Sequence, residues 1–210
     1  MRSNGVFGKS GTGKTFLTRL LLAGILQSGA ASNLVFDMES EYGWKGYSED
    51  SREVKGLKQL YSSKVAVFSL DEDSSKRRGL TPDYVVRIGY DEIEPEDIQL
   101  LRESLNLSEV AADAAYSLHR HLGKGWLGQF LEYPTGETFG ELATALGVNE
   151  RALSALKNRL FRFQRFGFMD AKSGHDSVGQ ILQYLDRGMH VVLEFGRYGN
   201  DLAAYILVSN

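Results

Sequence analysis

The sequence of 210 residues has no cysteine, three prolines and no long apolar run. Without cysteine the chain has no disulfide, no thiolate metal site and no thiol nucleophile, as expected for a protein of the reducing cytoplasm. Its longest apolar run, LLLAGIL at residues 20–26, is far shorter than the ~20 residues of a membrane-spanning helix. The opening residues, MRSNG, lack the apolar segment of a signal peptide. We therefore expect a cytoplasmic protein without a membrane partner.

An excess of charge of one sign is also missing. The formal net charge is -3, although 24% of the residues are charged and 42% are hydrophobic. This balance is typical of a soluble globular protein that buries a core. Because the net charge is small and negative, nucleic acid would have to be bound by a local basic patch. No internal repeat or proline-rich linker divides the chain, so we predict one α/β domain interrupted by a helical insertion.

A phosphate-binding signature is present almost at the start of the chain. GKSGTGKT, at residues 8–15, matches G-x-x-x-x-G-K-[ST] in full. Its glycines allow successive backbone N–H groups to point at phosphate oxygens, while Lys14 reaches the β- and γ-phosphates and Thr15 offers a hydroxyl to Mg²⁺. The alternative is a glycine-rich turn that matches by chance. The predicted site for ATP and Mg²⁺ comprises Gly8, Ser10, Gly11, Thr12, Gly13, Lys14, Thr15 and Phe16.

The elements on either side of this signature can also be predicted. The segment from Lys14 to Ser28 predicts an α-helix whose N-terminus completes the anion site, and Gly29 is a natural C-cap. Its apolar residues cover a wide face, as expected for a helix that packs against a sheet. A buried strand normally leads into such a loop, but only Val6 and Phe7 are present for it. We therefore expect a first strand that is cut short.

A carboxylate follows the next apolar run, NLVFD at residues 33–37. The run predicts a buried parallel strand, which places Asp37 at the carboxyl edge of the sheet beside the phosphate loop. There Asp37 would hold Mg²⁺ or orient the attacking water, or else it would only cap a turn. Glu41 would assist catalysis or contact a neighbouring subunit, or else it is a solvated loop residue.

The rest of the chain changes from strand to helix and back. Val65–Leu70 and Tyr84–Ile88 predict two strands, which we expect to form a hairpin around a polar, mobile loop. From residue 94 the periodicity is helical, and a buried strand at 189–195 and a last helix at 201–210 follow. The predicted domain boundaries are 1–93 for the first part of the core, 94–187 for the helical insertion and 188–210 for the resumed core.

Residues 137–172 predict a helix-turn-helix with a wing. Two helical stretches meet at Leu146-Gly147-Val148-Asn149, and FGFMD at residues 166–170 would supply the wing strand. Basic residues outnumber acidic ones from Arg151 to Lys172, which suggests contact with nucleic acid. The alternative is a helical hairpin whose basic face is solvated or meets an acidic subunit. The residues predicted to contact DNA are Arg151, Lys157, Arg159 and Arg162.

These motifs and their order resemble the HerA/FtsK superfamily of P-loop ATPases. GKSGTGKT and its long apolar helix are followed by LVFDMESEYGW, two strands, a helical excursion and VVLEFG, and HerA-like members show a similar order. The resemblance implies a RecA-like P-loop core with a parallel sheet. It also implies a hexameric, ATP-driven DNA translocase or helicase, often working with a nuclease. By position it implies these catalytic residues and Mg²⁺ ligands: Lys14, Asp37 and Glu41 for catalysis, and Thr15 and Asp37 for the metal.

The sequence also departs from the pattern of this family. The acidic strand that binds Mg²⁺ and activates water, the arginine finger and the N-terminal barrel are not found in it. Glu194 follows an apolar run, but the order of elements assigns it to the preceding strand. We therefore expect an incomplete core, a piece of a larger ATPase, that binds nucleotide weakly and hydrolyses it poorly or not at all. The alternatives are an ATP-binding regulatory module with a winged-helix DNA-binding insertion and a non-catalytic fragment with exposed sheet edges.

Overall fold

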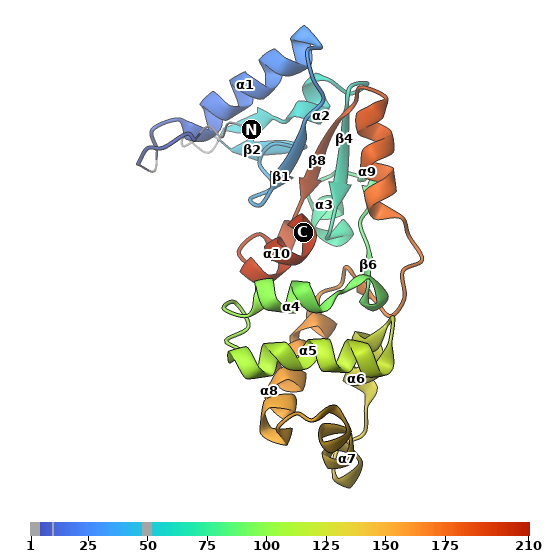
Figure 1. Cartoon of the computed structure of the whole chain (residues 1–210). Coiled ribbons are helices and arrows are strands. Elements are labelled where there is room, and N and C mark those ends of the chain that lie inside the picture. Colours follow the sequence, from blue (N-terminus) through green and yellow to red (C-terminus); the bar gives the residue numbers. More distant parts are fainter. Residues whose placement is uncertain (1–4, 10, 48–51) are drawn as a thin grey trace. The chain divides into compact units, whose positions relative to one another are not determined.

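The computed structural model describes residues 5–9, 11–47 and 52–210 (Figure 1). Its contacts divide the chain into two compact units. The first, here called the sheet unit, comprises Met1–Val85 and Ser177–Asn200. The second, the helical unit, comprises Val86–Asp176 and Asp201–Asn210. Each unit is therefore built from two separate stretches of the chain.

A four-stranded parallel sheet forms the centre of the sheet unit. Its strand order is β1-β8-β4-β5, so β8 lies between two strands that precede it in the chain (Figure 1). The strands, all parallel to their neighbours, are β1 at Leu34–Asp37, β8 at His190–Glu194, β4 at Val65–Ser69 and β5 at Tyr84–Val85. Every residue of β4 and β8 is buried, as continuous apolar runs predict for central parallel strands. The predicted α/β class with a parallel-sheet core is confirmed.

Shorter elements complete the sheet unit. The strands β2 at Lys45–Tyr47 and β3 at Glu53–Lys55 form an antiparallel pair. The helices are α1 at Lys14–Ser28, α2 at Leu57–Leu60, α3 at Glu72–Arg77 and α9 at Ser177–Asp186, with the 3₁₀ turn η3 at Gly196–Tyr198. Leu26 of α1 and Leu57 of α2 share one buried cluster with Val65 and Val192 of the sheet. This cluster holds α1 and α2 against the sheet.

Helix α1 has the bounds that the sequence predicts, and it ends at Gly29, which adopts a left-handed φ of 64°. Only its C-terminal part packs on the core, however, through Leu26. Four apolar residues of its N-terminal half are at least 54% exposed: Phe16, Leu17, Leu20 and Leu21. The sheet unit therefore covers part of the apolar face that the sequence predicts to pack against a sheet. Val6 and Phe7 are also exposed and lie outside any strand of the described residues, so the predicted first strand is not observed.

The predicted hairpin between residues 65 and 88 is wrong. β4 and β5 pair in parallel, with Phe68 opposite Tyr84. The segment between them, which the sequence suggested to be a mobile loop, contains α3. Asp71 begins α3 by accepting a hydrogen bond from the Ser74 N–H at 3.2 Å, and acidic residues precede basic ones along the helix. Because α3 returns the chain to the start of the sheet, β5 runs in the same direction as β4.

Helices dominate the second unit. They are α4 at Pro95–Leu101, α5 at Glu109–Leu122, α6 at Trp126–Glu132, α7 at Glu137–Leu146, α8 at Glu150–Leu160 and α10 at Leu202–Ser209, with the 3₁₀ turns η1 at Tyr90–Glu92 and η2 at Phe161–Arg165. Helix α5 contacts α4, α6, α7 and α8, and α10 packs against α4. Trp126, Phe130 and Phe163 are fully buried. The core of this unit therefore surrounds α5.

The helical unit also contains two short strands. β6 at Ile88–Gly89 and β7 at Met169–Asp170 pair in parallel. The segment 166–170, expected to be the wing of a winged helix, thus pairs with a strand that precedes α4 instead of flanking the helix pair. The winged helix over 137–172 stays a prediction, whereas both helices of the pair are present as α7 and α8.

The two compact units do not begin and end at the domain boundaries that the sequence predicts. Helix α9 lies in the sheet unit and α10 in the helical unit, so the units divide the chain at other positions. The boundaries 1–93, 94–187 and 188–210 stay a prediction. No helix among the described residues is long and apolar enough to cross a membrane.

Candidate nucleotide site

The phosphate loop is a compact turn that opens directly into α1. Gly11 and Gly13 adopt left-handed φ angles of 81° and 83°, which non-glycine residues rarely do. The Lys9 carbonyl accepts hydrogen bonds from the Thr12 hydroxyl at 2.8 Å and from the Lys14 ammonium at 2.6 Å. Ser10 lies outside the described residues. The loop is therefore curled as the signature requires, with Lys14 folded back over it.

The start of α1 offers an anion site. Gly13 precedes the helix and has no side chain to cap its first N–H groups. Lys14 and Thr15 occupy the first turn, and no acidic residue lies there to repel an anion. A side chain on Gly8 would overlap the Thr12 hydroxyl, so the loop backbone is closely packed on itself. These residues are suited to bind the phosphates of a nucleotide, and the Thr15 hydroxyl is suited to be a ligand of Mg²⁺.

Asp37 lies at the carboxyl end of β1 and is almost completely buried. Its Oδ1 accepts a hydrogen bond from the Glu41 N–H at 2.9 Å, and its Oδ2 accepts from Tyr42 and Gly43 at 2.7 and 3.2 Å. Burial raises the pKa of Asp37 to about 6, against the effect of these N–H donors, and the nearby charge of Glu194 adds to the rise. Both carboxylate oxygens therefore hold the turn after β1, which is the capping role that the sequence left open.

Glu194 stands beside Asp37, because the two residues are paired in the register of β8 and β1. It is fully buried, and the guanidinium of Arg78 donates to both of its carboxylate oxygens. Arg78 also donates to the Ser40 carbonyl at 3.3 Å. The sequence analysis did not identify Arg78, because it follows α3 in a segment interpreted as a mobile loop. The partly buried guanidinium of Arg78 thus links the end of β8 to the segment after β1.

Glu41 contributes its backbone to this site. Its carbonyl accepts a hydrogen bond from the Arg19 guanidinium at 2.6 Å, and that guanidinium lies 5.9 Å from the centre of the Tyr42 ring. No hydrogen bond or ion pair of the Glu41 carboxylate is found among residues 5–9, 11–47 and 52–210. Since Arg19 belongs to α1, this contact ties the helix of the phosphate loop to the segment after β1. It leaves the Glu41 side chain available for another partner.

The predicted Mg²⁺ ligands differ in how well they fit. Thr15 lies in the first turn of α1 and is partly exposed, whereas both oxygens of Asp37 already accept N–H groups. Within the part of the chain that the structure describes, no group of three or more His, Asp or Glu residues is arranged to hold a metal. Direct coordination by Asp37 would therefore require the turn at 41–43 to give up hydrogen bonds.

Comparison with known proteins identifies the family. The family model described as the central domain of the helicase HerA matches residues 1–210. The chain belongs to the HerA central-domain family. No curated protein and no solved structure matches it. Membership confirms the resemblance to HerA-like P-loop ATPases that the phosphate loop and LVFDMESEYGW indicated, and it agrees with a nucleotide-binding role for the loop in this HerA-like chain.

The residues predicted to contact DNA lie in the helical unit and differ in exposure. Arg151 and Arg159 are exposed, and Arg162 is paired with Asp201 at 2.8 Å. Lys157 is 4% exposed, donates to the Tyr133 carbonyl and lies 5.5 Å from the centre of the Phe139 ring. Burial lowers the pKa of this lysine. Lys157 is therefore removed from the predicted DNA contacts, because its ammonium faces the protein interior.

Proposed function

We propose that this chain is the ATP-binding core of a HerA-like DNA translocase or helicase. The observation that carries the proposal is the complete phosphate loop, with left-handed Gly11 and Gly13 leading into α1, in a chain of the HerA central-domain family. Lys14 would exchange the Lys9 carbonyl for β- and γ-phosphate oxygens. The Thr15 hydroxyl would bind the Mg²⁺ that accompanies the nucleotide.

The chemistry proposed for the assembled protein is in-line attack of water on the γ-phosphate, which ATP supplies when bound. Lys14 would stabilise the charge that develops on the phosphate oxygens. Asp37 would act mainly by fixing the turn that carries Glu41, and the unengaged carboxylate of Glu41 is the better group to orient water. A homohexameric ring, movement along DNA and cooperation with a nuclease, which the resemblance to HerA-like ATPases implies, also belong to this proposal.

Nucleotide binding tests the proposal most directly. Lys14→Ala should weaken the affinity for MgATP about 10- to 100-fold, because it removes a hydrogen bond to a charged phosphate worth about 1.5–3 kcal/mol. The matched control is Lys55→Ala, which removes an exposed lysine of β3 outside the signature. Calorimetric titration with MgATP and MgGTP would measure both variants and the base preference. Equal affinities for the wild type and Lys14→Ala would contradict the proposal.

Hydrolysis by this chain is expected to be slow. Asp37 holds three backbone N–H groups and Glu194 holds Arg78, so neither buried carboxylate is available to orient a water. Glu41→Gln should reduce the residual rate of phosphate release without changing the affinity for ATP. Turnover at about 1 s⁻¹ or faster that disappears in Lys14→Ala would show that the chain holds a complete catalytic site.

A second candidate function is an ATP-binding regulatory module that contacts DNA through the helical unit. The exposed arginines of α8 favour it. In this case DNA would leave the rate of ATP hydrolysis unchanged, whereas a translocase would hydrolyse ATP faster in the presence of DNA.

A further inference from the structure

The helix pair α7–α8 has the local geometry of a helix-turn-helix. Gly147 ends α7 in a left-handed conformation, with a φ of 66°, and the Val148 N–H bonds the Ala143 carbonyl at 3.0 Å. The Asn149 side chain then caps α8 by accepting from the Arg151 N–H at 2.9 Å. Both helices contact α5, and Leu142, Leu153 and Leu156 are buried. The second helix of the pair is thus held firmly on a three-helix core, as in proteins that insert this helix into the major groove.

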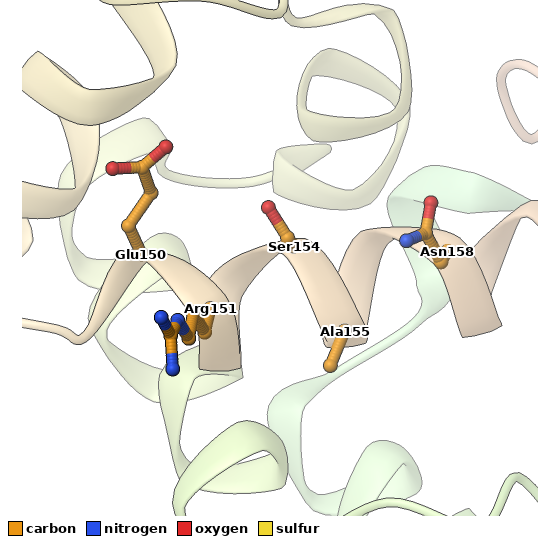
Figure 2. A pocket seen from close by; sticks show the side chains of 5 residues that line it. All are labelled: Glu150, Arg151, Ser154, Ala155 and Asn158. Carbon is orange, nitrogen blue, oxygen red and sulfur yellow. The ribbon is translucent and has the colours of Figure 1, made fainter.

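One face of α8 is open to a partner. It is lined by Glu150, Arg151, Ser154, Ala155 and Asn158, which border a hollow of about 460 Å³. Figure 2 shows Glu150, Ser154 and Asn158 along one side of this face and Arg151 and Ala155 along the other. The short side chains of Ser154 and Ala155 allow a partner to approach the helix closely. Arginine forms bidentate hydrogen bonds with guanine, and asparagine forms them with adenine. We call these five residues the reading face.

A second hollow adjoins the reading face through Asn158. It has a volume of about 320 Å³ and is lined by residues 104–106, Asn158, Arg159, Phe161, Arg162 and Arg165. Three guanidinium groups border it and no acidic residue does. Arg162 is paired with Asp201, whereas no ion pair of Arg159 or Arg165 is found in the described part of the chain. Such a group of arginines is suited to bind phosphate groups, because one guanidinium can donate two hydrogen bonds to one phosphate.

The adjacency of the two hollows indicates the kind of nucleic acid. Phosphate contacts position a protein on DNA and base-edge contacts give sequence preference, so both are needed side by side. Single strands are bound on rows of aromatic side chains, but Phe161 is the one aromatic residue that lines either hollow. The deep, narrow major groove of duplex RNA does not admit side chains. Duplex DNA fits this surface best.

We propose that the reading face of α8 binds the major groove of duplex DNA and recognises its sequence, with Arg159 and Arg165 on the flanking phosphates. This function deepens the second candidate function, and it differs from the sequence-independent backbone contacts of a translocase. Asn158, between the two hollows, is the central base-reading residue. Glu150 is the one acidic residue that lines these two hollows, and its carboxylate would accept a hydrogen bond from a cytosine amino group.

Binding of a labelled 20-base-pair duplex of mixed sequence to the full chain tests the phosphate contacts. The double variant Arg159→Ala/Arg165→Ala should lose at least tenfold in affinity, and the slope of log K against log salt should fall by about 2. Arg120→Ala is the matched control, because Arg120 is an exposed arginine of α5 that lines a separate hollow. Lys157→Met is a second control, because that lysine is buried. Unchanged affinity and slope in the double variant would overturn the proposal.

Selection from a pool of randomised duplexes tests the reading of sequence. The wild type should enrich one motif, and Asn158→Ala should lose its preference at one position by roughly tenfold while keeping its affinity for other sequences. The conservative double variant Arg159→Lys/Arg165→Lys should keep the motif. Failure of the wild type to enrich any motif, or an identical motif from Asn158→Ala, would refute recognition by α8.

The two proposals fail separately. Lys14→Ala should bind the duplex as the wild type does, and Arg159→Ala/Arg165→Ala should bind MgATP as the wild type does. If Lys14→Ala abolishes both activities, the duplex is bound by the nucleotide-dependent core, and the reading face is wrong. If only the arginine variant loses duplex binding, the DNA site on α8 holds whatever the outcome for ATP.

Discussion

At the scale of single residues, Asp37 shows how burial and hydrogen bonding compete. Three N–H groups stabilise its charged form, but the loss of water around the carboxylate and the neighbouring Glu194 favour the neutral form. The pKa of Asp37 therefore rises from 3.8 to about 6. At neutral pH the ionised carboxylate of Asp37, which accepts the N–H groups of the turn after β1, therefore lowers the stability of the fold.

This shift predicts that the sheet unit loses stability as the pH rises. Below about pH 4 Asp37 is protonated in both the folded and the unfolded chain. Between pH 3.8 and about 6 the folded chain binds more protons, so the free energy of unfolding falls with pH, and the loss is complete above pH 6. The contribution of this group is on the order of 3 kcal/mol. Urea unfolding followed by hydrogen exchange of the β4 and β8 amides, from pH 4 to 7, would measure it.

Asp37→Asn should remove most of this slope, because amide side chains do not titrate. The control is Glu39→Gln, which changes an exposed carboxylate two residues away. If Asp37→Asn keeps the pH dependence of the wild type, the slope arises from other groups and the burial of Asp37 costs little.

Lys157 shows a residue whose position could have been recognised from the sequence. Leu153, Leu156 and Leu160 mark the buried face of α8, and residue 157 is the fourth member of that face by helical spacing. Counting basic residues placed Lys157 in a surface patch, whereas its periodicity predicts burial. The methylenes of lysine can cover apolar surface, and here the ammonium also finds a carbonyl.

At the scale of elements, the glycines predict opposite effects in the sheet unit. A side chain on Gly199 would overlap the Met38 carbonyl, which is backbone and cannot move freely, so Gly199→Ala should destabilise the unit by about 1–3 kcal/mol. Gly24 lies inside α1 with nothing within 4 Å of its position for a Cβ. Gly24→Ala should therefore stabilise the unit by about 0.5–1 kcal/mol, because alanine restricts the unfolded chain.

Thermal unfolding of both glycine variants would separate steric overlap from backbone entropy. Stabilisation by both substitutions would mean that the segment after β8 adapts around Met38. Loss of stability in Gly24→Ala would mean that α1 depends on close packing at Gly24.

Continuous apolar runs and helical periodicity predicted β1, β4, β8 and α1, because these elements are defined by local sequence. The periodicity of EDSSKR does not predict α3, since its stability depends on the Asp71 cap and on charges at its ends. Because the sequence analysis did not predict α3, it interpreted the parallel strands β4 and β5 as a hairpin. The partner of each strand was also beyond local reasoning, because β8 enters the sheet from the far end of the chain.

In the candidate site, too, the local motif could be predicted from the sequence and the long-range contacts could not. The phosphate loop is defined by eight consecutive residues of the signature, so its residues could be named from the sequence. The ion pair of Arg78 with Glu194 joins positions 116 apart in the chain, and no local pattern pairs them. The sequence therefore located the loop but missed the buried network at the strand ends.

At the scale of the whole molecule, charge is distributed unevenly. The net charge of the chain is -3, yet three arginines border one hollow beside α8. Long-range attraction of DNA by the chain as a whole would be weak, so duplex affinity should depend on this local surface and on salt.

The position of β8 in the sheet has a consequence for the order of events during synthesis. β1 and β4 emerge early from the ribosome, but in the described sheet β8 lies between them, and β8 follows most of the helical unit in the chain. At about 5–20 residues per second, the strands wait on the order of ten seconds for their central partner. The helices around α5 are all made except α10 by then, so they can fold before the sheet closes. The sheet of the nucleotide core would therefore close only after most of the helical unit has been made.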